Sequence, residues 1–168
     1  QNYLEKLCEK SIDVLFTQFS GAMWYPAAYK YDKEKKSELS KKTRSFLIDT
    51  FIQLVNTVDA KYVVPSAGPP CFLEDELFEL NFSDNGIFPD QNDLLPFVEN
   101  KVKSKISCMN PGDHVILDSN GIKFYNTNTF DYNKKEQFLR QYQKKRAPII
   151  ENYLNNIPDP AGDLYKMF

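Results

Sequence analysis

Residues 61–72 constrain the fold of this chain more than any other stretch. A short apolar run over residues 62–65 is followed at once by Ser66, Ala67, Gly68 and two prolines. Because proline fixes the backbone φ angle and removes an N–H donor, the chain after the run is held to a narrow path. The pattern predicts a strand that leads into a shaped loop. Such a loop either carries binding residues on a rigid scaffold or simply turns the chain.

A second segment, residues 13–26, has the same form. Residues 12–19 are almost continuously apolar, and residues 20–26 form a turn of small residues that ends in Trp24, Tyr25 and Pro26. A continuous apolar run is typical of a strand that is buried on both faces, as in a parallel sheet. The two segments therefore predict two neighbouring parallel strands.

A long helix is expected between these strands. Apolar residues recur at offsets of three and four over residues 47–58, and Ser37 or Ser40 could cap the start of the helix. A strand, a helix and a second parallel strand make a β-α-β unit. In such a unit the loops after the two strands lie at the same edge of the sheet, where open α/β proteins bind ligands. The sequence therefore places residues 20–26 and 66–71 at one rim.

The remainder of the chain adds smaller elements. Residues 89–102 predict a short helix, and residues 105–125 predict an antiparallel β-meander, because turn residues separate three short runs of strand-forming residues. A last long helix follows Asp131, with a kink or a break at Pro148. The predicted fold class is α/β, with α+β elements at the C-terminal end. We expect one domain over residues 1–168.

Composition narrows the classes of function. With 21 Lys and Arg against 23 Asp and Glu, the formal net charge is −2, so no global field attracts nucleic acid. No run approaches the roughly twenty apolar residues of a membrane span. Three widely spaced cysteines without a Cys-x-x-Cys pair fit a reducing, cytoplasmic setting. Because the sequence starts at Gln1 rather than Met, we expect the chain to be part of a longer protein.

The sequence assigns no catalytic residue. His114 is the only histidine, and a plain strand residue is a commoner role for it than metal ligand or general base. Cys71 is expected to be an inert, packed thiol rather than a nucleophile, because no positive charge lies near it in the sequence. The acidic residues of segment 74–79 suit a hard cation only if the fold brings them together. A self-sufficient active site is therefore not expected.

The two rim loops supply the candidate binding residues. Trp24 and Tyr25 each combine an apolar body with a polar group, so they form either a binding platform or a lid over the core. Backbone N–H groups after residue 65 could hold an anionic group. We therefore predict a site for a small anionic substrate that consists of Ser20, Gly21, Trp24, Tyr25, Ser66, Ala67 and Gly68.

Over about residues 11–118 the chain resembles the second half of a metallo-β-lactamase-fold domain, in the branch that contains the CMP-N-acetylneuraminate hydroxylases. The resemblance lies in the order of residues 13–26, a basic helix and the sequence Tyr62-Val-Val-Pro-Ser-Ala-Gly68. It implies half of an αββα sandwich, whose metal ligands lie mainly in the other half. Ser66 stands roughly where the hydrolases have their last histidine ligand, and serine is a poor substitute. The hydroxylases also contain a Rieske iron–sulfur domain, whose paired cysteine and histidine ligands this chain lacks.

Two functions follow from the resemblance and the residues. The first is the C-terminal part of a metal-dependent enzyme, hydroxylase-like or hydrolase-like, which forms one wall of a cleft for a sugar nucleotide or another anionic small molecule. The metal, iron, manganese or zinc, is then expected in the complete protein, on a missing N-terminal half or a partner chain, with none bound by this chain alone. The second is a non-catalytic binding or assembly module, which the single histidine favours.

Overall fold

The structure is a computed structural model of the 168-residue chain, and it describes residues 12–20, 23–82, 87–126 and 130–156. The chain divides into two compact units, Gln1–Phe130 and Asp131–Phe168. Within the described residues, no helix combines the length and the apolar character that crossing a bilayer requires.

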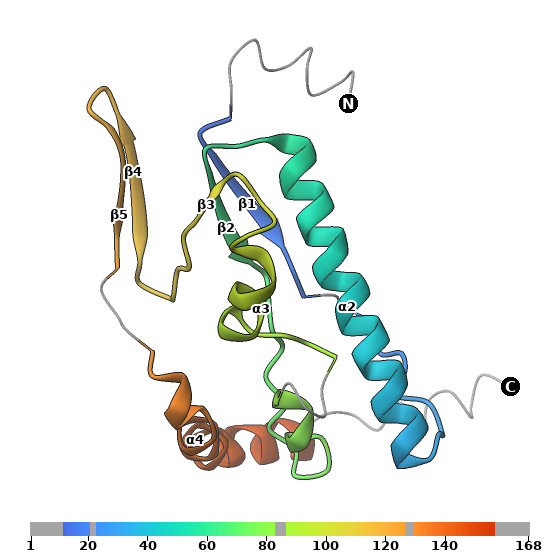
Figure 1. Ribbon diagram of the computed structural model, residues 1–168. Coiled ribbons are helices and arrows are strands. Elements are labelled where there is room, and N and C mark those ends of the chain that lie inside the picture. The colour runs from blue at the N-terminus through green and yellow to red at the C-terminus, as the bar shows by residue number, and fades with distance from the viewer. Residues whose placement is uncertain (1–11, 21–22, 83–86, 127–129, 157–168) are drawn as a thin grey trace, which may run out of the picture. The chain divides into compact units, whose positions relative to one another are not determined.

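A three-stranded parallel sheet forms the centre of the first unit. Its strands lie in the order β1 (Val14–Gln18), β2 (Tyr62–Ser66) and β3 (Lys105–Ile106). Helix α2 (Lys33–Val58) connects β1 to β2, and helix α3 (Gln91–Val98) precedes β3 (Figure 1). Because β1 and β2 pair in parallel along their whole length, the predicted β-α-β unit is confirmed.

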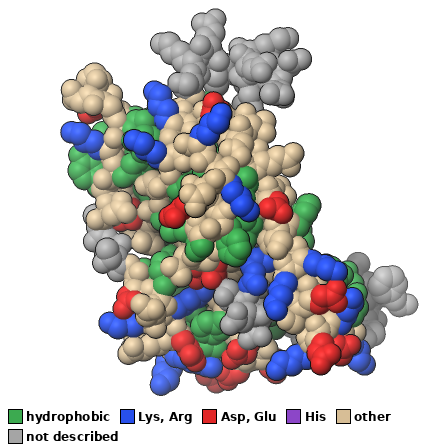
Figure 2. Space-filling model, viewed as in Figure 1, with side chains coloured by type: hydrophobic (Ala, Val, Ile, Leu, Met, Phe, Trp, Pro, Cys, Tyr) green, Lys and Arg blue, Asp and Glu red, His purple; other side chains and the backbone are tan. Residues whose placement is uncertain are grey.

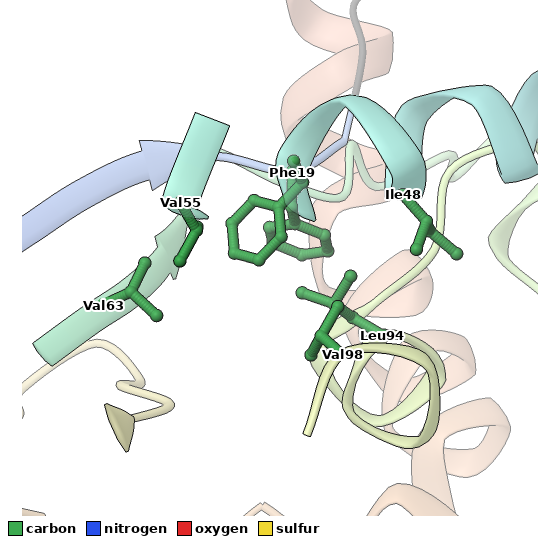
Figure 3. Packing of buried hydrophobic residues seen from close by; sticks show 7 residues of the cluster. Phe19, Ile48, Val55, Val63, Leu94 and Val98 are labelled. Atoms are coloured by element: carbon green, nitrogen blue, oxygen red, sulfur yellow. The ribbon is translucent and has the colours of Figure 1, made fainter. Parts of the chain in front are cut away.

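The main hydrophobic core joins this sheet to α2 and α3. Its buried side chains come from both helices, from β2 and from the residue after β1, and they are Phe19, Ile48, Phe51, Val55, Val63, Leu94 and Val98 (Figure 3). The rings of Phe19 and Phe51 meet edge to face with their centroids 6.4 Å apart. Burial of apolar surface contributes roughly 25 cal/mol per Å². This core therefore fixes β1 and β2, and with them the start of each rim loop.

Helix α2 begins earlier than the sequence pattern predicts. Asp32 is the N-cap, and its carboxylate accepts a hydrogen bond of 2.8 Å from the backbone N–H of Lys35. Ser37 and Ser40, the predicted caps, lie inside the helix, so that prediction is wrong. The apolar stripe starts only after the first turns, because those turns are charged and solvated. The stripe therefore marks where the helix becomes buried rather than where it begins.

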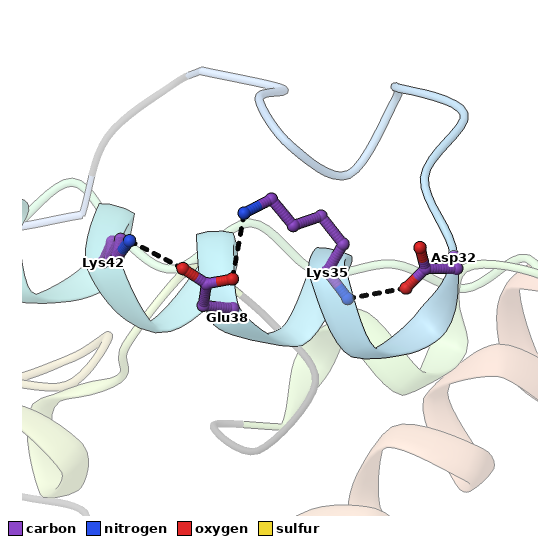
Figure 4. Close-up of polar contacts among 4 residues, drawn as sticks. All are labelled: Asp32, Lys35, Glu38 and Lys42. Atoms are coloured by element: carbon purple, nitrogen blue, oxygen red, sulfur yellow. Dashed lines mark hydrogen bonds and ion pairs between the residues drawn. The ribbon is translucent and has the colours of Figure 1, made fainter.

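The exposed side of α2 carries a small charge network. The Glu38 carboxylate lies between two lysines, 3.0 Å from the Nζ of Lys35 and 2.6 Å from the Nζ of Lys42 (Figure 4). These pairs have i,i+3 and i,i+4 spacing, at which side chains meet on a helix surface. The lysine-rich start of the helix is therefore partly neutralised within the helix itself.

The predicted meander over residues 105–125 is wrong in its first strand. β3 joins the parallel sheet beside β2, and the backbone N–H of Lys105 donates to the carbonyl of Lys61 at 3.0 Å. The antiparallel part is the hairpin of β4 (His114–Asp118) and β5 (Gly121–Tyr125). The prediction failed because the turn at residues 110–113 connects two different sheets. A turn signal in the sequence does not tell which strands it joins.

The second unit contains a 3₁₀ turn, Tyr132–Lys134, and helix α4 (Lys135–Asn156). Asp131 caps the turn, and its carboxylate accepts a hydrogen bond of 3.1 Å from the backbone N–H of Asn133. Helix α4 continues through Pro148, so this stretch is one helix and not two consecutive ones.

The coarse fold class is confirmed as mixed α/β, with two small sheets and a C-terminal helix. The finer expectation, half of an αββα sandwich, is not confirmed by these sheets. That the chain forms one domain stays a prediction. On the face shown in Figure 2, basic and acidic side chains are interspersed, in keeping with the net charge of −2. The expectation that nucleic acid is not a partner also stays a prediction.

Candidate binding groove at the rim of the parallel sheet

The two rim loops meet at a groove. β1 and β2 end in register, with Gln18 opposite Ser66, so the loops that follow leave the sheet at the same edge. Between them lies a groove of about 380 Å³, which we call the rim groove. Its lining includes Gln18, Ser20, Trp24, Gly68, Pro69 and Phe88. The juxtaposition of the loops that the sequence predicted is therefore present.

Ser20 and Gly68 touch at the base of the groove. Ser20 is only 1% exposed, and a Cβ atom built on Gly68 would lie 2.4 Å from the Cβ of Ser20. Glycine is therefore required at position 68 by the close approach of the other loop. The Ser20 hydroxyl has no hydrogen-bond partner in the described part of the chain. Its carbonyl oxygen accepts a hydrogen bond from the Gln18 side-chain amide.

Ala67 holds an uncommon backbone conformation beside this contact. Its φ angle is 56°, in the left-handed region that residues with a Cβ seldom occupy. Such a conformation costs on the order of 1 kcal/mol or more and persists only where neighbouring structure enforces it. The loop after β2 is thus held in a fixed shape by its surroundings.

Trp24 forms the aromatic wall of the groove. Its ring meets those of Phe72 and Phe88 edge to face, with centroid distances of 5.6 and 6.4 Å. Phe72 and Phe88 belong to a second buried cluster that also contains Ile87. Trp24 nevertheless remains 53% exposed and lines the groove. One part of the ring therefore covers a buried cluster while the rest faces solvent, and its role as a binding platform stays a prediction.

The other predicted site residues lie elsewhere. Tyr25 belongs to an exposed aromatic group with Tyr29 and Tyr31, whose centroids lie 5.2 and 6.4 Å from its own. The hydrogen bond with Tyr31 raises the pKa of Tyr25 above its ordinary value. Ser66 ends β2 and does not line the groove, and Gly21 lies outside the described residues. Their predicted role in substrate binding stays a prediction.

In the part of the chain that the structure describes, the residues with reactive side chains form no centre of their own. His114 stacks on Tyr125, with ring centroids 4.9 Å apart and an interplanar angle of 9°. Burial, and then the charge of Glu99, raises the pKa of the Cys108 thiol, which makes its thiolate scarce at neutral pH. Cys71 is exposed, so the prediction that its thiol is packed is wrong. Among the residues that the structure describes, no group of three or more His, Cys, Asp or Glu could hold a metal ion.

Sequence reasoning missed four lining residues of the groove: Gln18, Pro69, Pro70 and Phe88. Gln18 is a polar residue at the end of an apolar strand, and Pro69 and Pro70 belong to the loop already singled out, so these three had a signal. Phe88 had none, because it comes from a distant segment that reaches the rim only through tertiary packing.

Comparison with known proteins gives relatives of one kind. The chain is 46% identical over 84 residues to a Mycolicibacterium smegmatis protein whose name describes a Rieske 2Fe-2S iron–sulfur protein, a match covering 48% of this chain and 16% of the relative. Two similarly named Mycobacterium tuberculosis proteins match at 46% over 85 residues, with the same coverage. The chain thus spans about a sixth of the length of these relatives. No family model and no solved structure matches it.

These names overturn the resemblance to the metallo-β-lactamase fold and the function drawn from it. The relatives are named for an iron–sulfur cluster, not for hydroxylase or hydrolase chemistry, and the non-catalytic alternative gains no support from them. The cofactor expectation is wrong on the same finding, because the relatives are named for a 2Fe-2S cluster and not for a single iron, manganese or zinc ion. The resemblance rested on two loops and their spacing, and such features of a β-α-β unit recur in proteins of unrelated function.

The residues of this chain do not complete a Rieske centre. Such a centre takes two cysteines on one iron and two histidines on the other. The sequence contains one histidine, His114, whose ring stacks on a tyrosine. At least one histidine ligand would therefore have to come from outside this sequence.

Proposed function

We propose that this chain is part of an iron–sulfur protein that transfers electrons through a Rieske-type 2Fe-2S cluster. The observation that carries the proposal is the 46% identity over 84 residues to a relative named for such a cluster. Electron transfer at a cluster needs metal ligands and an approach for the redox partner, but no nucleophile or general base. It therefore does not require the Cys108 thiol, whose pKa is raised by burial, to act as a nucleophile.

Within that protein we assign ligand binding to the rim groove. The supporting features are the Ser20 hydroxyl without a partner in the described residues, the exposed Trp24 ring, and the Ala67 and Gly68 backbone held against Ser20. Such a combination of one polar group and apolar walls is typical of small-molecule sites.

The test of the iron–sulfur assignment is chemical analysis of the protein that carries this chain, produced with an iron–sulfur assembly system. We expect two iron and two acid-labile sulfide per chain, as the relatives' names imply. The reduced protein should give an EPR signal with nitrogen couplings from histidine, and a potential between about −150 and +300 mV. Iron without sulfide, or a cluster without nitrogen couplings, would contradict the proposal.

A His114→Gln variant serves as the matched control in this experiment. Because His114 stacks on Tyr125 and belongs to no metal-binding group within the described residues, we expect the iron and sulfide contents to be unchanged. Loss of the cluster in this variant would show that this chain supplies a ligand, and it would overturn our reading of His114.

A further inference from the structure

We infer that the rim groove binds a small uncharged molecule with a flat ring, which lies against Trp24 and accepts a hydrogen bond from the Ser20 hydroxyl. This inference rests on the part of the proposed function that assigns ligand binding to the rim groove, and it adds the class of ligand. It does not rest on the iron–sulfur cluster, since the residues that carry it all line the groove. It also differs from the anionic substrate expected from the sequence.

The charge of the ligand follows from the lining. Among the described residues that line the groove, which include Gln18, Ser20 and Phe88, none has an ionisable side chain. An anion entering it would lose hydration without gaining an ion pair, and such desolvation is costly. A neutral ligand avoids this cost.

The polar contact follows from Ser20. Its side chain is buried, it lines the groove, and its hydroxyl has no partner among the described residues. Native proteins leave few buried polar groups unpaired, so a hydroxyl of this kind at the wall of a groove points to an acceptor supplied by a ligand. A carbonyl or hydroxyl oxygen on the ligand fits this requirement.

The walls of the groove indicate that the ligand contains a flat ring. Trp24 is anchored on Phe72 and Phe88 but stays half exposed, and Pro69 lines the same groove. An aromatic ring that is held in place loses little entropy when a second ring packs on it. A groove of about 380 Å³ is large enough for one or two rings.

Trp24 also makes the inference easy to test, because it is the only tryptophan of the chain. We would titrate the complete chain with benzamide and follow tryptophan fluorescence, with benzoate as the anionic probe of the same shape. We expect a saturable change with benzamide at a dissociation constant on the order of 1 mM, as is usual for a ligand of this size. Benzoate should bind at least tenfold more weakly.

Variants locate the contact. Ser20→Ala keeps the Cβ that touches Gly68 and removes only the hydroxyl, so we expect the benzamide dissociation constant to rise about tenfold. Ser20→Gly should give the same loss and provides a second variant if the first does not fold. Ser104→Ala is the control, because the Ser104 hydroxyl is buried but donates to the Ala60 carbonyl at 2.6 Å. It should leave benzamide binding unchanged.

Two results would overturn the inference. If benzoate binds as tightly as benzamide, the groove is an anion site. If the folded Ser20 variants bind benzamide as tightly as the original chain does, the Ser20 hydroxyl does not donate a hydrogen bond to the ligand. Neither result affects the iron and sulfide analysis, so failure of this inference and failure of the proposed function can be told apart.

Discussion

At Ser20, a side chain that is unfavourable for stability is explained by its proposed role in ligand binding. A buried hydroxyl without a partner costs about 1 to 3 kcal/mol relative to a satisfied one. Ser20 is 1% exposed and its hydroxyl is unpaired within the described residues, whereas Ser104 is 8% exposed and its hydroxyl donates to the Ala60 carbonyl. The same chemical group thus has opposite effects on stability at the two positions.

Serine-to-alanine substitutions at these two positions should therefore change stability in opposite directions. Ser20→Ala should leave the free energy of unfolding unchanged or raise it by up to about 1 kcal/mol. Ser104→Ala should lower it by about 1 to 2 kcal/mol, because a hydrogen bond is lost and a carbonyl is left unpaired. Urea denaturation with matched slopes measures both. A destabilised Ser20→Ala variant would mean that Ser20 has a structural partner.

Glu38 shows how a local arrangement sets a titration. Hydrogen bonds from Lys42 and then Lys35 lower the pKa of its carboxyl from 4.5 to about 2. Since the folded-state pKa is depressed, the stabilisation from this network is present above about pH 4.5 and is lost as the pH falls toward 2. The groups are exposed, so salt should weaken the effect.

Carbon-13 NMR of the Glu38 carboxyl should give a titration midpoint well below 4.5. Lys42→Met should move the midpoint upward, because the largest favourable contact is removed. A midpoint near 4.5 in the original chain would show that the lysines do not hold the carboxylate in solution.

At the scale of elements, the β1 and β2 loops are fitted to each other. Gly68 has no side chain because the Cβ of Ser20 occupies the space, at 2.4 Å from where a Gly68 Cβ would be. The Oγ of the same side chain would lie 3.2 Å from that Cβ, whereas the backbone Cα of Ser20 would lie at 3.5 Å, which is an ordinary contact distance. The clash is therefore confined to one side chain, and removal of that side chain should relieve it.

A double-mutant cycle tests this fit. Gly68→Ala alone should destabilise the chain by about 1 to 3 kcal/mol, as expected for an overpacked site. Ser20→Gly combined with Gly68→Ala should recover most of that loss, so the two effects should not add. Thermal or urea unfolding of the four proteins gives the coupling energy. If the two changes in the free energy of unfolding simply add, the side chains at positions 20 and 68 do not contact each other.

Within elements, the sequence predicted what local pattern can encode. The β-α-β unit followed from two apolar runs separated by a helical stripe. The position of Trp24 and Gly68 at the same groove followed from the geometry of parallel strands. The start of α2 at Lys33, after the Asp32 N-cap, was missed because the first turns of the helix are solvated and lack the apolar stripe. β3 was misplaced because two residues carry too little pattern to specify a partner strand.

At the scale of the whole molecule, sequence reasoning had less to work with. Phe88 reaches the groove from outside both loops, and no pattern in the sequence around it predicts that position. The iron–sulfur chemistry named for the relatives also left no motif here, because one histidine cannot form the ligand pair that would have signalled it. The proposed functional class therefore rests on the relatives, whereas the proposed ligand site in the groove rests on the residues of this chain.

The most direct test of the groove is NMR of the complete chain with benzamide, because intermolecular contacts locate the ring without any assumption about function. We expect nuclear Overhauser effects from the benzamide ring protons to the Trp24 indole and to the Gly68 α-protons, and a Ser20 hydroxyl proton slowed in its exchange with water. Contacts to the indole that spare Gly68, or contacts confined to the tyrosines at positions 25, 29 and 31, would contradict the account.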